Sequence, residues 1–152
     1  MLNAGMMAPD FTLPSSDGGA VNLAALRGAP VVVYFYPKDD TSGCTTQACE
    51  FRDSWAAVQA TGATILGVSP DGLASHGKFR DKFNLPFPLL ADEDHAVAAA
   101  YGSWGEKSMY GRKYLGIIRN TFVIDAQGVV QHVFEKVKPK GHAAEVLAVL
   151  ER

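Results

Sequence analysis

Two cysteines are the residues of this sequence best suited to do chemistry. Cys44 and Cys49 are the only cysteines in the 152-residue chain, and they lie five positions apart. A thiolate is a strong nucleophile and can be oxidised reversibly. A chain of this length can fold without a disulfide, so a close pair indicates a catalytic, redox-active or metal-binding site rather than a structural crosslink.

The segments around Cys44 predict where its sulfur is held. Residues 31–36 are an uninterrupted apolar and aromatic run, which predicts a buried strand, and Pro37 ends it. After a polar loop, a helix is predicted to begin near Cys44, with Thr41 or Ser42 as its N-cap. Its apolar residues recur every three or four positions: Ala48, Phe51, Trp55 and Val58. Cys44 is thus expected on the first turn of a helix, where free backbone N–H groups and the helix dipole favour a thiolate.

The composition is that of an ordinary globular domain. The chain carries a formal net charge of −2 and has no basic run, so neither nucleic acid nor an anionic membrane is an expected partner. No apolar stretch approaches the ~20 residues of a membrane-spanning helix. The first residues lack the charged and apolar regions of a signal peptide, which favours a cytoplasmic location. We expect a single domain over residues 1–152.

Strand and helix patterns alternate along the chain. Strands are predicted at 11–13, 21–23, 31–36, 63–69, 121–125 and 129–134, with a short one ending near residue 90, and helices at 44–60, 73–83, 94–101 and 141–150. This order predicts an α/β fold with a central mixed sheet flanked by helices, in which the last two strands pair as an antiparallel hairpin. Residues 102–116 are rich in glycine and are predicted to form a long connection, with Trp104, Tyr110 and Tyr114 as packing or wall residues.

The pattern Pro37-x-x-x-Thr41-x-x-Cys44 resembles the active-site signature of the peroxiredoxins, which are thiol peroxidases with a thioredoxin-like fold. A second cysteine five residues after the first resembles the bacterioferritin comigratory protein (Q-type) subfamily. Further segments in the family's order are APDF at 8–11, YFYPKDDT at 34–41, GVS at 67–69, FPLL at 87–90, YG at 101–102 and RNTFVID at 119–125. The resemblance covers nearly the whole chain. It implies a thioredoxin-like domain with an N-terminal hairpin extension, and no cofactor.

Matched residue by residue, the resemblance assigns five positions. It makes Cys44 the peroxidatic cysteine, Cys49 the resolving cysteine, Thr41 the hydroxyl that bonds the peroxide and the thiolate, Pro37 the proline that shields the pocket, and Arg119 the cation beside the sulfur. One departure is Ser42, where the family often has proline; this changes loop stiffness more than chemistry. Residues 73–83, where some relatives carry a resolving cysteine, contain none.

Elementary chemistry asks for the same groups. Attack on a peroxide needs a deprotonated sulfur, an orienting donor, positive charge for the leaving oxygen and a route back to the thiol. The helix terminus and a cation favour the deprotonated sulfur of Cys44. The hydroxyl of Thr41 and the loop N–H groups can orient the peroxide. The guanidinium of Arg119 offers a fixed fork of donors that keeps its charge.

The route back to the thiol makes a geometric prediction. A sulfenic acid on Cys44 would condense with Cys49 to form a disulfide. Five residues along an intact α-helix place two Cα atoms roughly 8–9 Å apart, beyond the ~7 Å that a disulfide tolerates. The first turns of the helix are therefore predicted to unwind in each cycle. Thr45 and Thr46 are poor helix formers, which favours unwinding.

Other interpretations stay open from the sequence alone. Cys44 could be an inert buried thiol, Cys49 plain core, Arg119 a surface ion-pair residue and Thr41 only a helix cap. Asp39 and Asp40 are predicted to form a solvated loop. The four histidines are scattered, and none has metal-ligand spacing with the cysteines.

Three functions compete on this basis. The first is a monomeric two-cysteine peroxiredoxin that reduces hydrogen peroxide and organic hydroperoxides and is recycled by thioredoxin or a glutaredoxin-like protein. The second is a general disulfide oxidoreductase, which normally uses a C-x-x-C motif that this chain lacks. The third is a redox-sensing or chaperone-like module that uses a Cys44–Cys49 switch without turnover.

Overall fold

The computed structural model describes residues 2–152. Its elements are β1 (Thr12–Pro14), β2 (Ala20–Asn22), the short 3-10 helix η1 (Ala24–Leu26), β3 (Val31–Phe35), α1 (Ser42–Asp53), α2 (Trp55–Ala60), β4 (Thr64–Ser69), α3 (Leu73–Phe83), β5 (Leu89–Ala91), α4 (Ala96–Ala100), β6 (Trp104–Met109), β7 (Arg112–Ile117), β8 (Thr121–Ile124), β9 (Val130–Phe134) and α5 (His142–Leu150). Among these residues no helix combines the length and apolarity required to cross a membrane.

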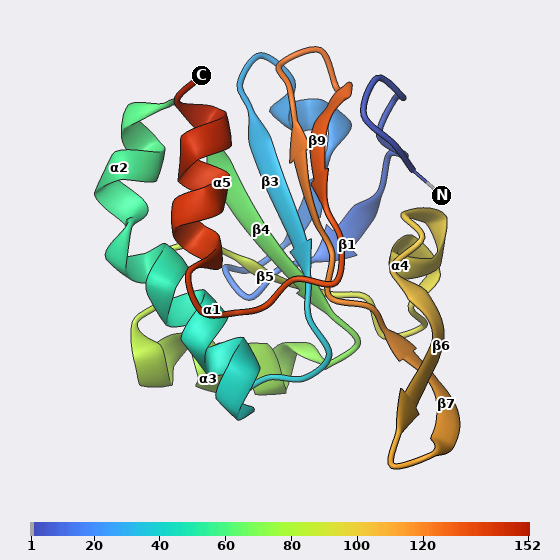
Figure 1. Cartoon of the computed structure of the whole chain (residues 1–152). Helices are drawn as coiled ribbons and strands as arrows, with labels where there is room; N and C mark the ends of the chain where they lie inside the picture. Colours follow the sequence, from blue (N-terminus) through green and yellow to red (C-terminus); the bar gives the residue numbers. More distant parts are fainter. Residues whose placement is uncertain (1) are drawn as a thin grey trace.

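A five-stranded mixed sheet forms the centre of the molecule (Figure 1). Its strand order is β5-β4-β3-β8-β9, with β3 parallel to β4 and antiparallel to β8. Strands β8 and β9 pair as an antiparallel hairpin at one edge, as the sequence predicts. Two small hairpins, β1/β2 and β6/β7, lie outside this sheet. The predicted mixed sheet with flanking helices and an N-terminal hairpin is thus confirmed.

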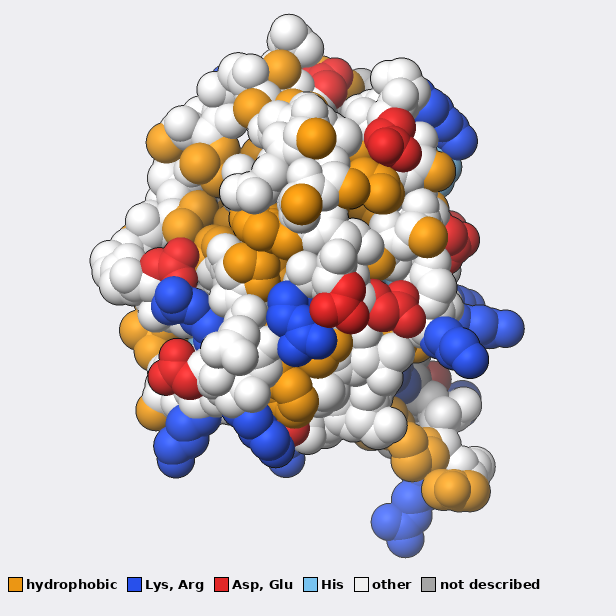
Figure 2. Space-filling view, turned by 90° about the vertical axis from the view of Figure 1, so that its left-hand side faces the viewer, with side chains coloured by type: hydrophobic (Ala, Val, Ile, Leu, Met, Phe, Trp, Pro, Cys, Tyr) orange, Lys and Arg blue, Asp and Glu red, His pale blue; other side chains and the backbone are white. Residues whose placement is uncertain are grey.

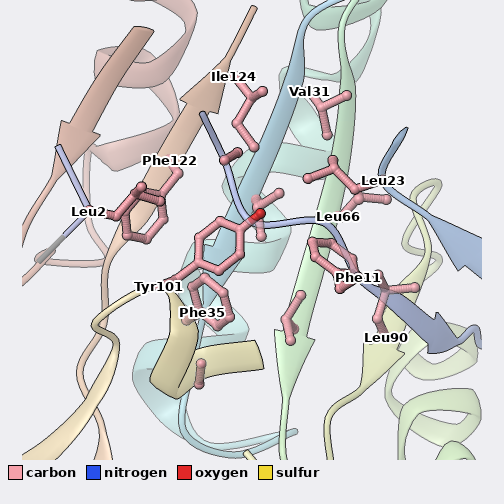
Figure 3. Packing of buried hydrophobic residues seen from close by; sticks show 14 of the residues in the cluster. Leu2, Phe11, Leu23, Val31, Phe35, Leu66, Leu90, Tyr101, Phe122 and Ile124 are labelled. Atoms are coloured by element: carbon pink, nitrogen blue, oxygen red, sulfur yellow. The ribbon is translucent and has the colours of Figure 1, made fainter. Parts of the chain in front are cut away.

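Strand β3 lies at the centre of the core because both of its faces are apolar. All five of its residues are buried. Val31 and Phe35 point into a cluster that contains Tyr101, the residue after α4, and residues of the N-terminal segment (Figure 3). Val32 and Tyr34 point to the opposite face, into a cluster that residues of α1, α2, α3 and α5 complete. The alternation of strand side chains therefore assigns α1, and both cysteines with it, to the second face.

The β6/β7 hairpin corrects the predicted long connection at residues 102–116. Met109 pairs with Arg112, and the two residues between them, Tyr110 and Gly111, both have positive φ (51° and 77°). This is the backbone of a tight two-residue hairpin turn. The hairpin projects from the body of the molecule (Figure 1), and Figure 2 shows it at the lower right with apolar and basic side chains. Tyr110 is 99% exposed, so its predicted packing role is wrong.

The helix that carries both cysteines is shorter than predicted. In place of one helix to about residue 60, α1 ends at Asp53 and α2 begins at Trp55. Ser54 between them has φ −94° and ψ 5°, outside the helical range. Serine competes with the helix by offering the backbone other hydrogen bonds, which makes it a natural interruption. Cys44 and Cys49 nevertheless lie on the same unbroken helix.

Candidate active site

Cys44 is the third residue of α1, close to where the chain leaves β3. Thr41 occupies the N-cap position, and its carbonyl accepts the N–H of Thr45 at 2.8 Å. The first turn carries no acidic side chain, so nothing on it opposes the positive end of the helix dipole. Cys44 is 1% exposed and belongs to the apolar cluster that also contains Tyr34 and Phe51. Its sulfur is therefore held in a shielded site at a helix N-terminus.

Arg119 reaches this sulfur from the segment between β7 and β8. Its Nη2 donates to the Sγ of Cys44 at 3.2 Å, and its Nη1 donates to the Oε1 of Gln47 at 2.7 Å. The backbone of Arg119 is held as well, because its carbonyl accepts the N–H of Val137 at 2.7 Å. A hydrogen bond from a guanidinium stabilises a thiolate more than a thiol. The fold thus brings together two residues that the sequence separates by 75 positions.

Gly43 gives the guanidinium room beside the helix. A Cβ on Gly43 would lie 3.4 Å from the Nη2 of Arg119 and 3.3 Å from the Cγ of Pro139. The distance to Pro139 is tighter than ordinary van der Waals contact for such an atom, and the distance to Arg119 is at its lower limit. The missing side chain at Gly43 therefore lets Arg119 approach the first turn of α1 closely.

Thr41 and Pro37 lie near the site without contacting the sulfur through a hydrogen bond. The hydroxyl of Thr41 donates to the carbonyl of Lys38 at 2.9 Å and makes no side-chain cap bond. Within residues 2–152 it makes no hydrogen bond to Cys44 either. Pro37 is half-buried, directly after the β3 segment. In this reduced form Thr41 directly precedes α1 with its hydroxyl bonded to its own loop, and Pro37 lies four residues earlier in the same loop.

Cys49 lies further along α1 in different surroundings. It is half-buried, and both cysteines are free thiols. The helix is unbroken from Ser42 to Asp53, so Cys44 and Cys49 are separated by five residues of regular α-helix. The Cα separation expected of that geometry, roughly 8–9 Å, exceeds the reach of a disulfide. The structure therefore represents a reduced form in which the two sulfurs cannot join.

Gln47 is a site residue that the sequence analysis missed. It is fully buried, one helical turn after Cys44, and its Oε1 accepts from Arg119. Its Nε2 has no hydrogen-bond partner among the described residues. The available signal was the spacing of three from Cys44, which puts both side chains on one face of a helix. Gln47 therefore fixes Nη1 of the Arg119 guanidinium, while Nη2 of the same group contacts the sulfur.

The two aspartates in the segment before α1 differ from each other, and only one of them is solvated as predicted. Asp40 is exposed and pairs with Lys82 at 2.8 Å, which agrees with a solvated loop. Asp39 is 7% exposed and bonds to Tyr36 and His76, so the same prediction is wrong for Asp39. The partners of Asp39 come largely from α3, which lies more than thirty residues away in sequence. Local polarity therefore could not predict its burial.

An open pocket of about 420 Å³ lies beside Arg119. It is lined by Glu106, Lys107, Ser108, Ile118, Arg119, Lys136 and Val137, from the β6/β7 hairpin and the segments around β8 and β9. Burial, and then the nearby guanidinium of Arg119, lower the pKa of Lys107. The sequence analysis did not find Lys107, because it treated this segment as a loop. The pocket offers apolar and cationic groups next to the arginine that contacts Cys44.

Comparisons with known proteins agree on one family. The pattern of the AhpC/TSA family matches residues 4–133. Peroxiredoxin Bcp of Bacillus subtilis is 47% identical over 150 residues, which are 99% of this chain and 96% of the relative. Peroxiredoxin Bcp of Escherichia coli is 47% identical over 146 residues, which are 96% of this chain and 94% of the relative.

A solved structure supports the same relationship. The bacterioferritin comigratory protein of Xanthomonas campestris, described for its alkyl peroxide reduction activity, is similar with a TM-score of 0.91. It is 41% identical in sequence, and the match covers 98% of each chain. At this identity and coverage the likeness extends to the whole described structure. The predicted thioredoxin-like fold and the predicted subfamily are therefore both confirmed.

Proposed function

The chain belongs to the AhpC/TSA family as a peroxiredoxin of the Bcp type, a thiol-dependent peroxidase, and on this premise we propose that Cys44 is its peroxidatic cysteine and Cys49 its resolving cysteine. The observation that carries the proposal is the 3.2 Å hydrogen bond from Arg119 to the Sγ of Cys44. A buried thiol that served only as core would have no need of a guanidinium. The helix N-terminus and this cation both favour the thiolate.

In the first step the Cys44 thiolate attacks the terminal oxygen of the peroxide. The S–O bond forms as the O–O bond breaks, and the leaving oxygen takes a proton and departs as water or an alcohol. Sulfur is oxidised to a sulfenic acid. The Nη2 of Arg119 already lies beside the sulfur and can stabilise the charge that develops on the leaving oxygen. Rotation of the Thr41 hydroxyl away from the Lys38 carbonyl would let it donate to the bound peroxide.

In the second step the thiol of Cys49 attacks the sulfenic sulfur. An S–S bond forms, the S–O bond breaks, and the oxygen leaves as water with the proton of the thiol. Because α1 is unbroken between the two cysteines, this step requires the first turns of the helix to unwind. Unwinding also removes Cys44 from its shielded site, so the disulfide becomes accessible to a reductant.

We propose thioredoxin as that reductant, with a glutaredoxin-like protein as the alternative. An external dithiol returns both cysteines to thiols and is itself oxidised to a disulfide, which balances the two electrons taken by the peroxide. Such a donor system operates in a reducing compartment, and we propose the cytoplasm. We also propose that the enzyme acts as a monomer, because both cysteines of the cycle lie on one helix of one chain.

The pocket beside Arg119 supports organic hydroperoxides as substrates in addition to hydrogen peroxide. The similar protein from Xanthomonas campestris is described as reducing alkyl peroxides. In this chain Ile118 and Val137 line the open space next to Arg119, and they could contact an alkyl group whose peroxide end faces the sulfur. A volume of about 420 Å³ falls in the usual range for small-molecule sites.

The proposal is tested by peroxide consumption coupled to thioredoxin, thioredoxin reductase and NADPH. Wild-type protein should turn over many times, and Cys44→Ser should reduce the rate to background because the nucleophile is lost. Cys49→Ser should consume about one peroxide per chain and then stop, because the sulfenic acid cannot be resolved. Continued turnover by Cys44→Ser would refute the assignment. A parallel assay with glutathione and glutaredoxin identifies the donor.

A further inference from the structure

Asp39, five residues before Cys44, is the centre of a buried polar network. Its Oδ1 accepts the hydroxyl of Tyr36 at 2.6 Å, and its Oδ2 accepts the hydroxyl of Ser75 at 2.8 Å. The Nδ1 of His76 lies 2.7 Å from the same Oδ2. Asp39 is 7% exposed and His76 is fully buried. None of these side chains contacts the sulfur through a hydrogen bond, so the chemistry described above does not account for them.

The surroundings of His76 determine where its protons are. Its Nε2 lies 2.9 Å from the carbonyl oxygen of Leu90, which can only accept, so Nε2 carries a proton. Its Nδ1 faces a carboxylate on which two hydroxyl donors already converge. Burial, with Tyr34 and Asp39 nearby, raises the pKa of Tyr36 well above its ordinary value, so this phenol keeps its proton and donates. Both ring nitrogens of His76 thus face acceptors, which is the arrangement that an imidazolium paired with the Asp39 carboxylate requires.

The network fixes Asp39, in the loop between β3 and α1, to three other parts of the fold. Ser75 and His76 belong to α3, and Leu90 belongs to β5. The backbone N–H of Asp39 donates to the Oδ2 of Asp71, in the connection between β4 and α3, at 2.7 Å. Asp39 is therefore held through its side chain and its backbone, by groups that do not belong to α1.

Beyond Asp39 the chain is held much less firmly. Asp40 has a positive φ of 55°, and its side chain reaches Lys82 at an exposed position. Thr41 and Ser42 are exposed, and α1 begins there. The buried Asp39–His76 contact thus lies immediately before a sharp turn in the backbone and before the helix whose first turns must unwind. Buried ion pairs contribute little net stability but fix geometry, and loss of one partner leaves an uncompensated charge.

We propose that the Asp39–His76 ion pair is an anchor at which the unwinding of α1 stops. The inference rests on the proposed Cys44–Cys49 cycle. In the disulfide form the residues from about 40 to 49 rearrange, while residues 36–39 keep the positions that they have in the reduced form. When the disulfide is reduced, α1 rewinds from this fixed end, and Thr41 returns to its place before Cys44 while Pro37 has stayed in position. Asp39 and His76 are positioning residues that act through the loop.

Hydrogen exchange on the wild-type protein tests the anchor without any substitution. The amide of Asp39 donates within the anchor, and the amide of Thr45 donates to Thr41 in the first turn of α1, so the two amides report on either side of the boundary. In reduced protein both should be protected. After one equivalent of peroxide, Thr45 should lose protection and Asp39 should keep it. Equal loss at Asp39 would overturn the proposal. Failure to form any Cys44–Cys49 disulfide would instead refute the proposed function.

The charge state of the His76 ring provides a second test of the anchor. An imidazolium at residue 76 has protons on both ring nitrogens, and NMR correlations between ring protons and nitrogens distinguish it from either neutral form. The imidazolium pattern should persist in both the reduced and the disulfide protein. A neutral ring in the reduced protein, or loss of the pattern on oxidation, would overturn the anchor.

Substitutions separate the two steps of the cycle. Asp39→Asn should slow the first oxidation of Cys44 about 10- to 100-fold, because Pro37 and Thr41 are no longer held in place, and should not slow disulfide formation. The matched control is Asp40→Asn, which removes the same charge from the next residue and breaks only the exposed pair with Lys82; both of its rates should change less than about twofold. Equal slowing of both steps by Asp39→Asn, or equal effects of the two variants, would overturn the proposal.

A double substitution tests whether Asp39 acts through His76. If the two residues form one anchor, His76→Gln should slow the first oxidation much as Asp39→Asn does. The double variant should slow this oxidation by less than the product of the two single effects. Additive effects would mean that the residues act independently and would refute the pair.

Discussion

The two cysteines of α1 differ in their surroundings far more than in their chemistry. Cys44 is 1% exposed, lies on the first turn and accepts a hydrogen bond from Arg119. Cys49 is half-buried in the middle of the same helix, and across residues 2–152 no hydrogen bond reaches its sulfur. One thiol has a helix terminus and a guanidinium beside it. The other has neither.

This difference explains how two identical side chains can divide the work of one cycle. The attacking sulfur needs a stabilised negative charge, which the helix N-terminus and Arg119 supply, and protection from competing reactions, which its burial supplies. The resolving sulfur needs to reach the first one after α1 unwinds, and for that a half-buried position is enough. In the proposed cycle, burial and charge, rather than residue type, therefore distinguish the two roles.

Removing the guanidinium should produce the largest effect on this contrast. Arg119→Met takes away both the donor at 3.2 Å from the sulfur and the charge that meets the leaving oxygen. We expect the second-order rate of Cys44 oxidation to fall about 100- to 1,000-fold, while resolution by Cys49 changes little. Stopped-flow measurement of the two steps checks this.

The control for that prediction is Arg112→Met. Arg112 is exposed on β7, so the same substitution there should leave both rates unchanged. Arg119→Lys keeps the charge but loses the forked guanidinium that contacts both Cys44 and Gln47. Its rate of Cys44 oxidation should lie between those of Arg119→Met and Arg112→Met. A rate for Arg119→Met within a few-fold of wild type would show that the first turn alone activates Cys44.

Gln47 should have the next largest effect, since it orients the arginine without contacting the sulfur. Gln47→Met keeps the length of the side chain but removes the acceptor that holds Nη1 at 2.7 Å. We expect oxidation of Cys44 to slow about tenfold, which is the usual worth of a hydrogen bond to a charged group. Gln59→Met, the same substitution at an exposed position of α2, is the control and should have no effect. An unchanged oxidation rate in Gln47→Met would mean that the Val137 contact suffices to orient Arg119.

The sequence predicted those parts of the site that depend on local pattern. The buried strand before Pro37, the helix start at Cys44 and the mixed sheet follow from periodicity and breakers, and they agree with the structure. The contact of Arg119 with Cys44 could be anticipated only through the family signature, because 75 residues separate the two. Spacing within one helix could have pointed to Gln47, but spacing does not reveal burial.

The failures of prediction have two physical causes. The sequence predicts a connection at residues 102–116 because most side chains of the hairpin are exposed, so the segment shows little alternation of apolar and polar residues. The signal for its turn was the glycine after Tyr110. The sequence predicts a solvated Asp39 because the partners that bury it, on α3, are distant in sequence. In both cases tertiary contacts, or their absence, decided the structure of a segment whose local composition resembled a loop.

Changing the stability of α1 between the two cysteines should have the smallest effect, and this effect should fall on disulfide formation, the second step. Thr45 and Thr46 lie between the two cysteines at half-buried and exposed positions, and threonine is a weaker helix former than alanine. Replacing both with alanine should stabilise α1 by about 1 kcal/mol and slow disulfide formation about fivefold, with little change in the first oxidation. The longer-lived sulfenic acid should then be oxidised to a sulfinic acid more readily, because a second peroxide competes with Cys49.

A control must separate the strength of α1 from the stability of the whole fold. Gly77→Ala serves, because Gly77 lies within α3 and a Cβ there would meet nothing within 4 Å, so the change should stabilise another helix by up to about 1 kcal/mol. If unwinding is confined to α1, this variant should raise the melting temperature and leave disulfide formation unchanged. Slower disulfide formation in both variants would mean that the second step requires a wider opening of the fold. An unchanged rate in the Thr45→Ala/Thr46→Ala protein would mean that helix strength does not limit it.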